Sequence, residues 1–204
     1  MKTMRVIVIG ATGTIGRAVA DALSARHEVV RVGHSGGDLT VDIEQKDAIV
    51  RFYEQVGSFD ALVCAAGRAQ FGIIDKMTDD DVALGINSKL LGQVNLVRLG
   101  AAKVADGGSF TLTSGLLAHQ PVVGSSSISL INAGVEAFAK GAALELARGV
   151  RVNVVSPPWV SETLVAMGRD PSGGLPAATV ANAYVEAVEG ARNGETLDAR
   201  KFRG

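Results

Sequence analysis

The sequence alternates between short runs of β-branched residues and longer amphipathic stretches, and this alternation limits the folds that it can adopt. The runs with strand character are Arg5–Ile9, Glu28–Val32, Asp60–Ala65, Ser109–Thr113 and Arg151–Val155. The stretches with helical spacing are Thr14–Arg26, Glu44–Val56, Asp80–Lys103, Ser125–Ala147 and Ala177–Ala191, and an edge strand is expected near 194–198. Strands that alternate with helices form right-handed βαβ units. The pattern therefore predicts an α/β fold, a doubly wound parallel sheet with helices on both faces.

Length and charge favour a single domain, residues 1–204. A chain of 204 residues is long enough for one core, and it contains no linker, repeat or low-complexity block. Its 20 basic and 21 acidic side chains leave a formal net charge of −1. Such a balance supplies no overall attraction to nucleic acid or to an anionic membrane, so neither is expected as a partner. No signal peptide or spanning segment is expected either.

The few cysteines and histidines exclude several kinds of chemistry. Cys64 is the single cysteine, so an internal disulfide and a multi-cysteine metal site are both excluded. One unpaired cysteine is typical of a reducing compartment, and we predict a cytoplasmic protein. The three histidines, His27, His34 and His119, have no metal-ligand spacing, so no metal is expected.

A glycine-rich loop joins the first predicted strand to the first predicted helix. In this position Gly10 would permit a tight turn, Gly13 a close approach of the backbone to a ligand, and Gly16 the packing of helix on strand. Backbone N–H groups at a helix N-terminus bind phosphate, so the loop predicts a Rossmann-type dinucleotide site. A purely structural turn is the alternative. The predicted contacts of this loop are Gly10, Thr12, Gly13, Thr14, Ile15 and Gly16.

The end of the second strand bears on which dinucleotide is bound. An acidic residue there would accept hydrogen bonds from the adenosine ribose and favour NAD. The segment reads Val32-Gly33-His34-Ser35-Gly36, and no acid occurs before Asp38. Arg17 and His34, with Ser35 beside it, could instead face a 2′-phosphate. We therefore predict NADP as the preferred cofactor, with NAD as the alternative.

Four further segments carry recognisable motifs. They are Val41-Asp42-Ile43, Cys64-Ala65-Ala66-Gly67, Thr113-Ser114-Gly115 and the run 151–160, which reads RVNVVSPPWV. With the glycine loop, they resemble the short-chain dehydrogenase/reductase family over nearly the whole chain. Three departures are that Gly13 stands one place early in the loop motif, that Cys64 replaces an asparagine and that Pro158 replaces a glycine. The resemblance implies cofactor contacts from Asp42, Ile43, Ala65, Ala66, Gly67, Asn132 and Pro157.

The family's catalytic pair is missing. The family uses Tyr-x-x-x-Lys on its fifth helix, where the tyrosine is the general acid and the lysine binds ribose. Aligning the run from Ala133 to Phe138 with the family places Ile128 and Asn132 at those two positions, and neither is competent for the role. The chain has two tyrosines, Tyr53 and Tyr184, and neither is followed by a lysine four residues later. A general acid contributes roughly 10²–10⁴-fold, so its loss slows ketone reduction without excluding it.

Other polar residues are candidates to act in place of the missing pair. The resemblance places Ser114 and Asn87 at the family's active-site serine and helix-four asparagine, and we predict both as catalytic. His119 is a further candidate acid because histidine titrates near neutrality. Each has a structural alternative: Ser114 could cap a turn, Asn87 could support its helix, and His119 could be a bystander. The serines 125–127 are expected to cap the following helix.

These residues support three functions. The first is an oxidoreductase with a non-standard active site that acts on a small-molecule carbonyl or alcohol. The second is a non-catalytic NAD(P)-binding sensor or partner protein, and the third is an isomerase or epimerase with a bound cofactor. The resemblance also implies a homodimer or homotetramer formed through the apolar helices near 86–104 and 128–147.

Overall fold

A computed structural model describes residues 2–203. Seven strands form one sheet in the order β3-β2-β1-β4-β5-β6-β7, and every neighbouring pair is parallel. The strands are β1 (Arg5–Ile9), β2 (Glu28–Gly33), β3 (Leu39–Thr40), β4 (Phe59–Cys64), β5 (Val104–Thr113), β6 (Arg151–Ser156) and β7 (Thr196–Asp198). The order reverses between β1 and β4, and ligands of such sheets bind beyond the carboxyl ends of the strands at this point.

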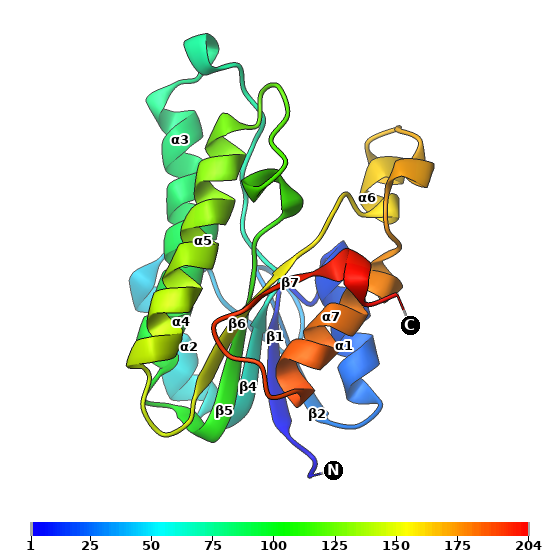
Figure 1. Cartoon of the computed structure of the whole chain (residues 1–204). Helices are drawn as coiled ribbons and strands as arrows, with labels where there is room; N and C mark the ends of the chain where they lie inside the picture. The colour runs from blue at the N-terminus through cyan, green and yellow to red at the C-terminus, as the bar shows by residue number, and fades with distance from the viewer. Residues whose placement is uncertain (1, 204) are drawn as a thin grey trace.

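Helices cover both faces of the sheet (Figure 1). One layer holds α2 (Lys46–Val56), α4 (Gly92–Gly100) and α5 (Ser126–Glu145), and the other holds α1 (Thr14–Ser24) and α7 (Ala177–Glu189). Two short helices, α3 (Asp79–Gly85) and α6 (Ser161–Ala166), lie beyond the carboxyl ends of the strands. The predicted doubly wound, Rossmann-type fold is confirmed.

Strand β1 shows why these residues form a sheet between two layers. Ile7 and Ile9 are buried in the core shared with α2, α4 and α5, whereas Val6 and Val8 are buried in the core shared with α1 and α7. Successive side chains of a strand point to opposite faces, so an uninterrupted apolar run fits a strand that is covered on both sides. Each fully buried side chain of this kind contributes about 1.5–3 kcal/mol.

The prediction of one long helix over Asp80–Lys103 is wrong in detail. The segment begins with α3, capped by reciprocal hydrogen bonds between Thr78 and Asp81, continues as a π-helix over Ile86–Leu91, and ends as α4. A π-helix inserts a residue into the helical repeat and so re-aims the side chains around it. Periodicity alone does not reveal this insertion. In this segment Ser88 is buried against the loop after β4 and Lys89 reaches the end of β5, whereas Asn87 is exposed.

Two more differences concern the ends of elements. Four 3-10 turns lie in connections, at Ile74–Lys76, Leu116–Ala118, Pro171–Gly173 and Ala199–Lys201. Ser125 occupies the N-cap of α5 as predicted, but its hydroxyl makes no capping hydrogen bond. It bonds Val122 instead, donating to the carbonyl at 2.8 Å and accepting from the N–H at 2.9 Å, and thereby closes the preceding loop.

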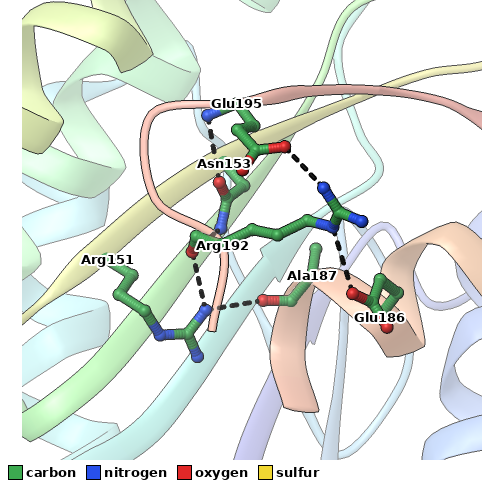
Figure 2. Close-up of polar contacts among 6 residues, drawn as sticks. All are labelled: Arg151, Asn153, Glu186, Ala187, Arg192 and Glu195. Carbon is green, nitrogen blue, oxygen red and sulfur yellow. Dashed lines mark hydrogen bonds and ion pairs between the residues drawn. The ribbon is translucent and has the colours of Figure 1, made fainter. Parts of the chain in front are cut away.

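The start of the motif run 151–160 has a structural role (Figure 2). Arg151 Nη1 donates to the carbonyls of Ala187 and Arg192, at 3.0 and 3.1 Å. The amide of Asn153 donates to the same Arg192 carbonyl and accepts from the Glu195 N–H. These contacts fix the end of α7 and the approach to β7, because they satisfy carbonyls that a helix end leaves free.

Candidate active site

The glycine loop forms an open helix N-terminus beside β1. Gly10 has φ +85°, and a Cβ there would lie 2.6 Å from the Ala65 carbonyl oxygen, so only glycine lets the loop after β4 come this close. A Cβ on Gly16 would lie 2.0 Å from the Gly10 oxygen. Gly13 is the N-cap of α1, and no side chain caps the helix or places an acid in its first turn. The first N–H groups of α1 are thus available to an anion.

A cavity of about 700 Å³ adjoins this helix end. Thr12, Gly13 and Thr14 line it together with residues of α1, α6 and α7. The Arg17 side chain is exposed there and donates to the Thr12 carbonyl at 3.2 Å. The cavity size is within the usual range for small-molecule and cofactor sites.

The end of β2 presents groups without a carboxylate to solvent. His34 and Ser35 are exposed. The first acid after them, Asp38, accepts a hydrogen bond from the Arg31 N–H at 2.8 Å and so closes the turn toward β3. Asp42 is half-buried beyond β3 and accepts from the Glu44 N–H, and Ile43 is buried. No carboxylate of residues 32–37 occupies the end of the strand, where it would compete with a 2′-phosphate.

Beyond β5, three polar side chains form a cluster. Ser114 is 2% exposed, and its Oγ donates to Glu136 Oε1 at 2.7 Å. The other carboxylate oxygen of Glu136 lies 2.6 Å from Nε2 of His119. Glu136 is buried on α5, whereas more than half of the His119 side chain is exposed. The buried carboxylate therefore orients a hydroxyl on one side and a solvent-accessible imidazole on the other.

The positions at which the family has tyrosine and lysine lie on the same stripe of α5. Ile128, Asn132 and Glu136 follow one another at intervals of four residues and therefore share a face of the helix. Ile128 is buried, and the amide of Asn132 lies 3.4 Å from the Gly115 carbonyl oxygen, to which it donates. The Oδ1 atom of Asn132 is buried and has no hydrogen-bond partner within residues 2–203. On this stripe, Asn132 contacts the carbonyl of Gly115, whereas Glu136 contacts the hydroxyl of Ser114, the residue before it.

Lys89 is a member of the site that sequence reasoning missed. Its Nζ donates to the Ser114 carbonyl at 2.9 Å, and burial lowers the pKa of Lys89 to about 8. Gly67 makes room for it, since a Cβ there would lie 2.8 Å from the Lys89 Cα. Asn87, two residues earlier, is exposed, so the structure does not bring it to the cluster.

Glu136 and Lys89 are the two site residues that the sequence analysis did not predict, and the sequence contains a signal for each. Glu136 repeats the four-residue spacing that joins Ile128 to Asn132, and a carboxylate on that stripe faces the same strand ends. For Lys89 the only signal is its presence among apolar residues two positions after Asn87. The π-helix that turns it inward is not encoded in a motif.

Neither tyrosine nor the cysteine serves as an acid or base near neutral pH. Tyr53 donates to the Leu96 carbonyl, and Tyr184 shares a 2.7 Å hydrogen bond with Thr113; both are in the core, and burial raises both pKa values. Burial raises the pKa of Cys64 to about 12. Cys64 is fully buried, as an unreactive core cysteine is.

An aromatic pair bridges two of the loops beyond the sheet. Phe71, after β4, stacks on Trp159, after β6, with ring centroids 5.8 Å apart. The Arg169 guanidinium lies over the same indole, 5.2 Å from its centroid. Such contacts are worth about 0.5–1.5 kcal/mol each and tie the two loops together. Pro157, just before, is buried, and its carbonyl accepts from the Leu116 N–H.

Within residues 2–203, no three or more His, Cys, Asp or Glu side chains are grouped so that they could hold a metal ion. None of the helices in that range combines the length and apolar character that crossing a membrane requires.

Comparison with known proteins agrees with this architecture. A family model described as enoyl-(acyl carrier protein) reductase matches residues 4–189. The protein lin1944 of Listeria innocua is 43% identical, with a TM-score of 0.92 over 96% of this chain and 99% of that one. A small-chain dehydrogenase solved in complex with NADPH is 28% identical, with a TM-score of 0.85 over the full length of both chains.

Curated relatives match more weakly. The 3-oxoacyl-(acyl-carrier-protein) reductase FabG of Haemophilus influenzae is 25% identical over 186 residues, which cover 80% of this chain and 77% of that protein. Together with the parallel sheet and the glycine cradle, these matches identify the chain as a member of the short-chain dehydrogenase/reductase family. It is accordingly an oxidoreductase of that family in fold and in the framework of its nicotinamide-cofactor site.

Proposed function

We propose that this protein is an NADP-preferring oxidoreductase that interconverts a small-molecule carbonyl and alcohol without the family's tyrosine and lysine. The observation that carries the proposal is the intact cradle of Gly10, Gly13 and Gly16, whose uncapped helix adjoins a cavity of about 700 Å³. A solved relative binds NADPH. The cofactor's chemistry, when it is bound, is hydride donation to or removal from a substrate carbon.

The preference for NADP is supported by the end of β2. Asp38 is engaged in the turn, and His34 and Ser35 are exposed at the strand end and carry no carboxylate. Arg17 lies near the loop with a free side of its guanidinium toward solvent. A 2′-phosphate could be met here by Arg17 and His34, whereas residues 32–37 contain no acid to accept hydrogen bonds from a ribose hydroxyl.

Ser114, Glu136 and His119 are the residues that we propose for handling the proton. Reduction of a carbonyl creates an alkoxide that must be protonated. Glu136 accepts the hydrogen bond of the Ser114 hydroxyl and lies against His119, and the exposed His119 ring, once it has given a proton to the alkoxide, can regain one from water. The arrangement of a donor held by a buried carboxylate is one that enzymes use to fix a histidine tautomer. Asn87 has no part in this proposal because its side chain is exposed.

Oligomerisation is proposed on the apolar surface of the α4–α5 layer. Leu130 and Leu144 of α5 are 57% and 89% exposed, and Leu91 just before α4 is 42% exposed. We propose a homodimer or homotetramer that covers them, because exposed large apolar side chains on one layer favour association. A monomeric mass in light scattering would contradict it. Cytoplasmic location remains a prediction.

The test of the proposed function separates binding from turnover. Thermal unfolding is measured with millimolar NADPH or NADH; a micromolar Kd would add about 4 kcal/mol of stability, with NADPH giving the larger shift. Absorbance of the nicotinamide is then followed over a panel of ketones, aldehydes and enones. Turnover that falls in both Ser114→Ala and His119→Ala supports the proposed proton donors. Binding without turnover on any substrate would favour a nucleotide-binding protein without catalysis, and no binding would overturn the proposal.

A further inference from the structure

Lys89 is a half-buried cation to which residues 2–203 supply a single hydrogen-bond acceptor. Its Nζ contacts the Ser114 carbonyl, and it forms no ion pair with any residue of 2–203. An ammonium group has three N–H donors, so two remain. The proposed reaction described above uses none of its donors.

Asn132 has an unused hydrogen-bond acceptor, and the residue that it contacts, Gly115, directly follows the Ser114 that Lys89 contacts. Its Nδ2 donates to the Gly115 carbonyl, and its buried Oδ1 accepts no hydrogen bond from any group in the part of the chain that the structure describes. Ser114 and Gly115 are consecutive, so Lys89 from the π-helix and Asn132 from α5 reach the same strand end from two elements. One offers unused donors and the other an unused acceptor.

A continuous series of contacts joins this pair to the glycine loop. The Gly10 Cα faces the Ala65 carbonyl, and Gly67 packs directly against the backbone of Lys89. The series therefore runs from the end of β1, where the phosphates are proposed to bind, past the end of β4 to the end of β5. A dinucleotide held at the helix N-terminus of α1 extends across these strand ends from the point where the strand order reverses.

We propose that Lys89 and Asn132 together bind the vicinal hydroxyls of the ribose on the nicotinamide side of the cofactor, Lys89 as donor and Asn132 Oδ1 as acceptor. The inference rests on the proposed function. A ribose diol supplies both an acceptor oxygen and an O–H donor, which are the two groups that this pair lacks. The lysine that the family carries on its fifth helix is thereby replaced by one from the fourth helical segment, and asparagine occupies the vacated position.

The structure also explains why the replacement is possible. The π-helix over Ile86–Leu91 turns Lys89 toward the sheet, and glycine at position 67 leaves space for its backbone and stem. Gln93, one turn further, supports the arrangement: its amide donates to the carbonyls of Lys89 and Thr113, at 3.0 Å each. Lys89 is in this way held against the end of β5 before any ligand binds.

The test compares a whole dinucleotide with its adenosine half. Kd values for NADPH and for adenosine 2′,5′-bisphosphate, which has no nicotinamide ribose, are measured for the unaltered protein, Lys89→Met and the control Lys140→Met on the exposed side of α5. For Lys89→Met we expect NADPH affinity to fall about tenfold or more, as for a lost charged hydrogen bond. Binding of the bisphosphate should change less than twofold, and Lys140→Met should change neither.

Two further variants address the pair itself. Asn132→Ala removes the acceptor while keeping Lys89 and should show the same selective loss; it also provides the test should Lys89→Met fail to fold. In the exchange variant Lys89→Asn/Asn132→Lys, NADPH affinity should recover relative to Lys89→Asn alone, because the cation returns to the same strand end from α5.

Each remaining outcome is decisive. Unchanged NADPH affinity in both Lys89→Met and Asn132→Ala would overturn the inference while leaving the proposed function intact. Equal loss of NADPH and bisphosphate would show a structural role and would also overturn it. If the unaltered protein binds neither ligand, the proposed function fails and the inference fails with it.

Discussion

The two ends of the proposed cofactor site are built in different ways. Around the glycine loop, contact with a ligand would come from backbone N–H groups. Positions 10 and 16 must be glycine there, because the neighbouring backbone leaves no room for a Cβ. Beyond β5, contact would come from side chains, namely Lys89, Asn132 and the Ser114–Glu136–His119 cluster. The backbone end keeps the family's three glycines, with the middle one a single place early, whereas the side-chain end lacks the family's catalytic pair.

This difference has a physical reason. A backbone cradle depends on torsion angles and steric space that only glycine provides, so there are few ways to build it. A charge or a proton donor at a strand end can be supplied from any element that reaches that point. Four variants probe this comparison, and the largest effect is expected at the backbone end.

Gly16→Ala should be the most damaging change. Its Cβ would lie 2.0 Å from the Gly10 carbonyl oxygen, which is backbone and cannot move aside cheaply. We expect a loss of at least about 3 kcal/mol in the free energy of unfolding, together with loss of NADPH binding. Gly13→Ala is the control, since its Cβ meets only the Gly10 oxygen at 3.4 Å. Urea denaturation of both variants measures the difference, and similar stabilities would refute the steric account of the cradle.

Glu136→Leu should have the next largest effect. It removes the acceptor of the buried Ser114 hydroxyl, and a buried polar group without a partner costs about 1–3 kcal/mol. The proposed turnover should fall as well, because His119 loses its support. Glu145→Leu, an exposed change on the same helix, is the control and should leave both properties nearly unaltered. Denaturation and steady-state rates are measured; equal behaviour of the two variants would argue against the cluster.

The pH dependence of NADPH affinity tests Lys89. Burial lowers the pKa of the Lys89 side chain to about 8, and its titratable neighbours are Cys64 of β4, whose pKa is raised to about 12, and Glu136 of α5, linked through Ser114. Binding of an acceptor favours the ammonium form, so affinity is complete below pH 8 and is lost as the pH rises through it. The slope cannot exceed about tenfold per pH unit. Titration by fluorescence should show this loss in the unaltered protein and a flat profile in Lys89→Met.

His34→Asp should have the smallest effect. An acid at the end of β2 would accept hydrogen bonds from a ribose and repel a 2′-phosphate, shifting the ratio of the NADPH and NADH affinities toward NADH by about tenfold. Because His34 is exposed, stability should stay within about 0.5 kcal/mol. Ser58→Asp, outside the site, is the control. An unchanged ratio would argue that position 34 is not near the adenosine ribose.

Much of the fold could be predicted from the sequence. The bounds of β1 are those predicted, and β2, β4 and β6 differ from their predictions by a single residue at one or both ends. Uninterrupted apolar runs in the strands and helical spacing of apolar residues in the helices reflect local burial, which a single sequence records directly. The helix predicted across Asp80–Lys103 failed because a π-helix changes the phase of the segment without changing its composition.

In the candidate site, too, some features could be predicted from local sequence patterns and others could not. The glycine loop and the absence of Tyr-x-x-x-Lys are legible in the sequence, because each depends on residue identity at fixed spacing. The pairing of Glu136 with Ser114 and His119, and the approach of Lys89 to Ser114, join residues 17 to 25 positions apart. Only the packing of α5 and the π-helix against the end of β5 decides these contacts, since no local pattern specifies which side chains of two different elements meet.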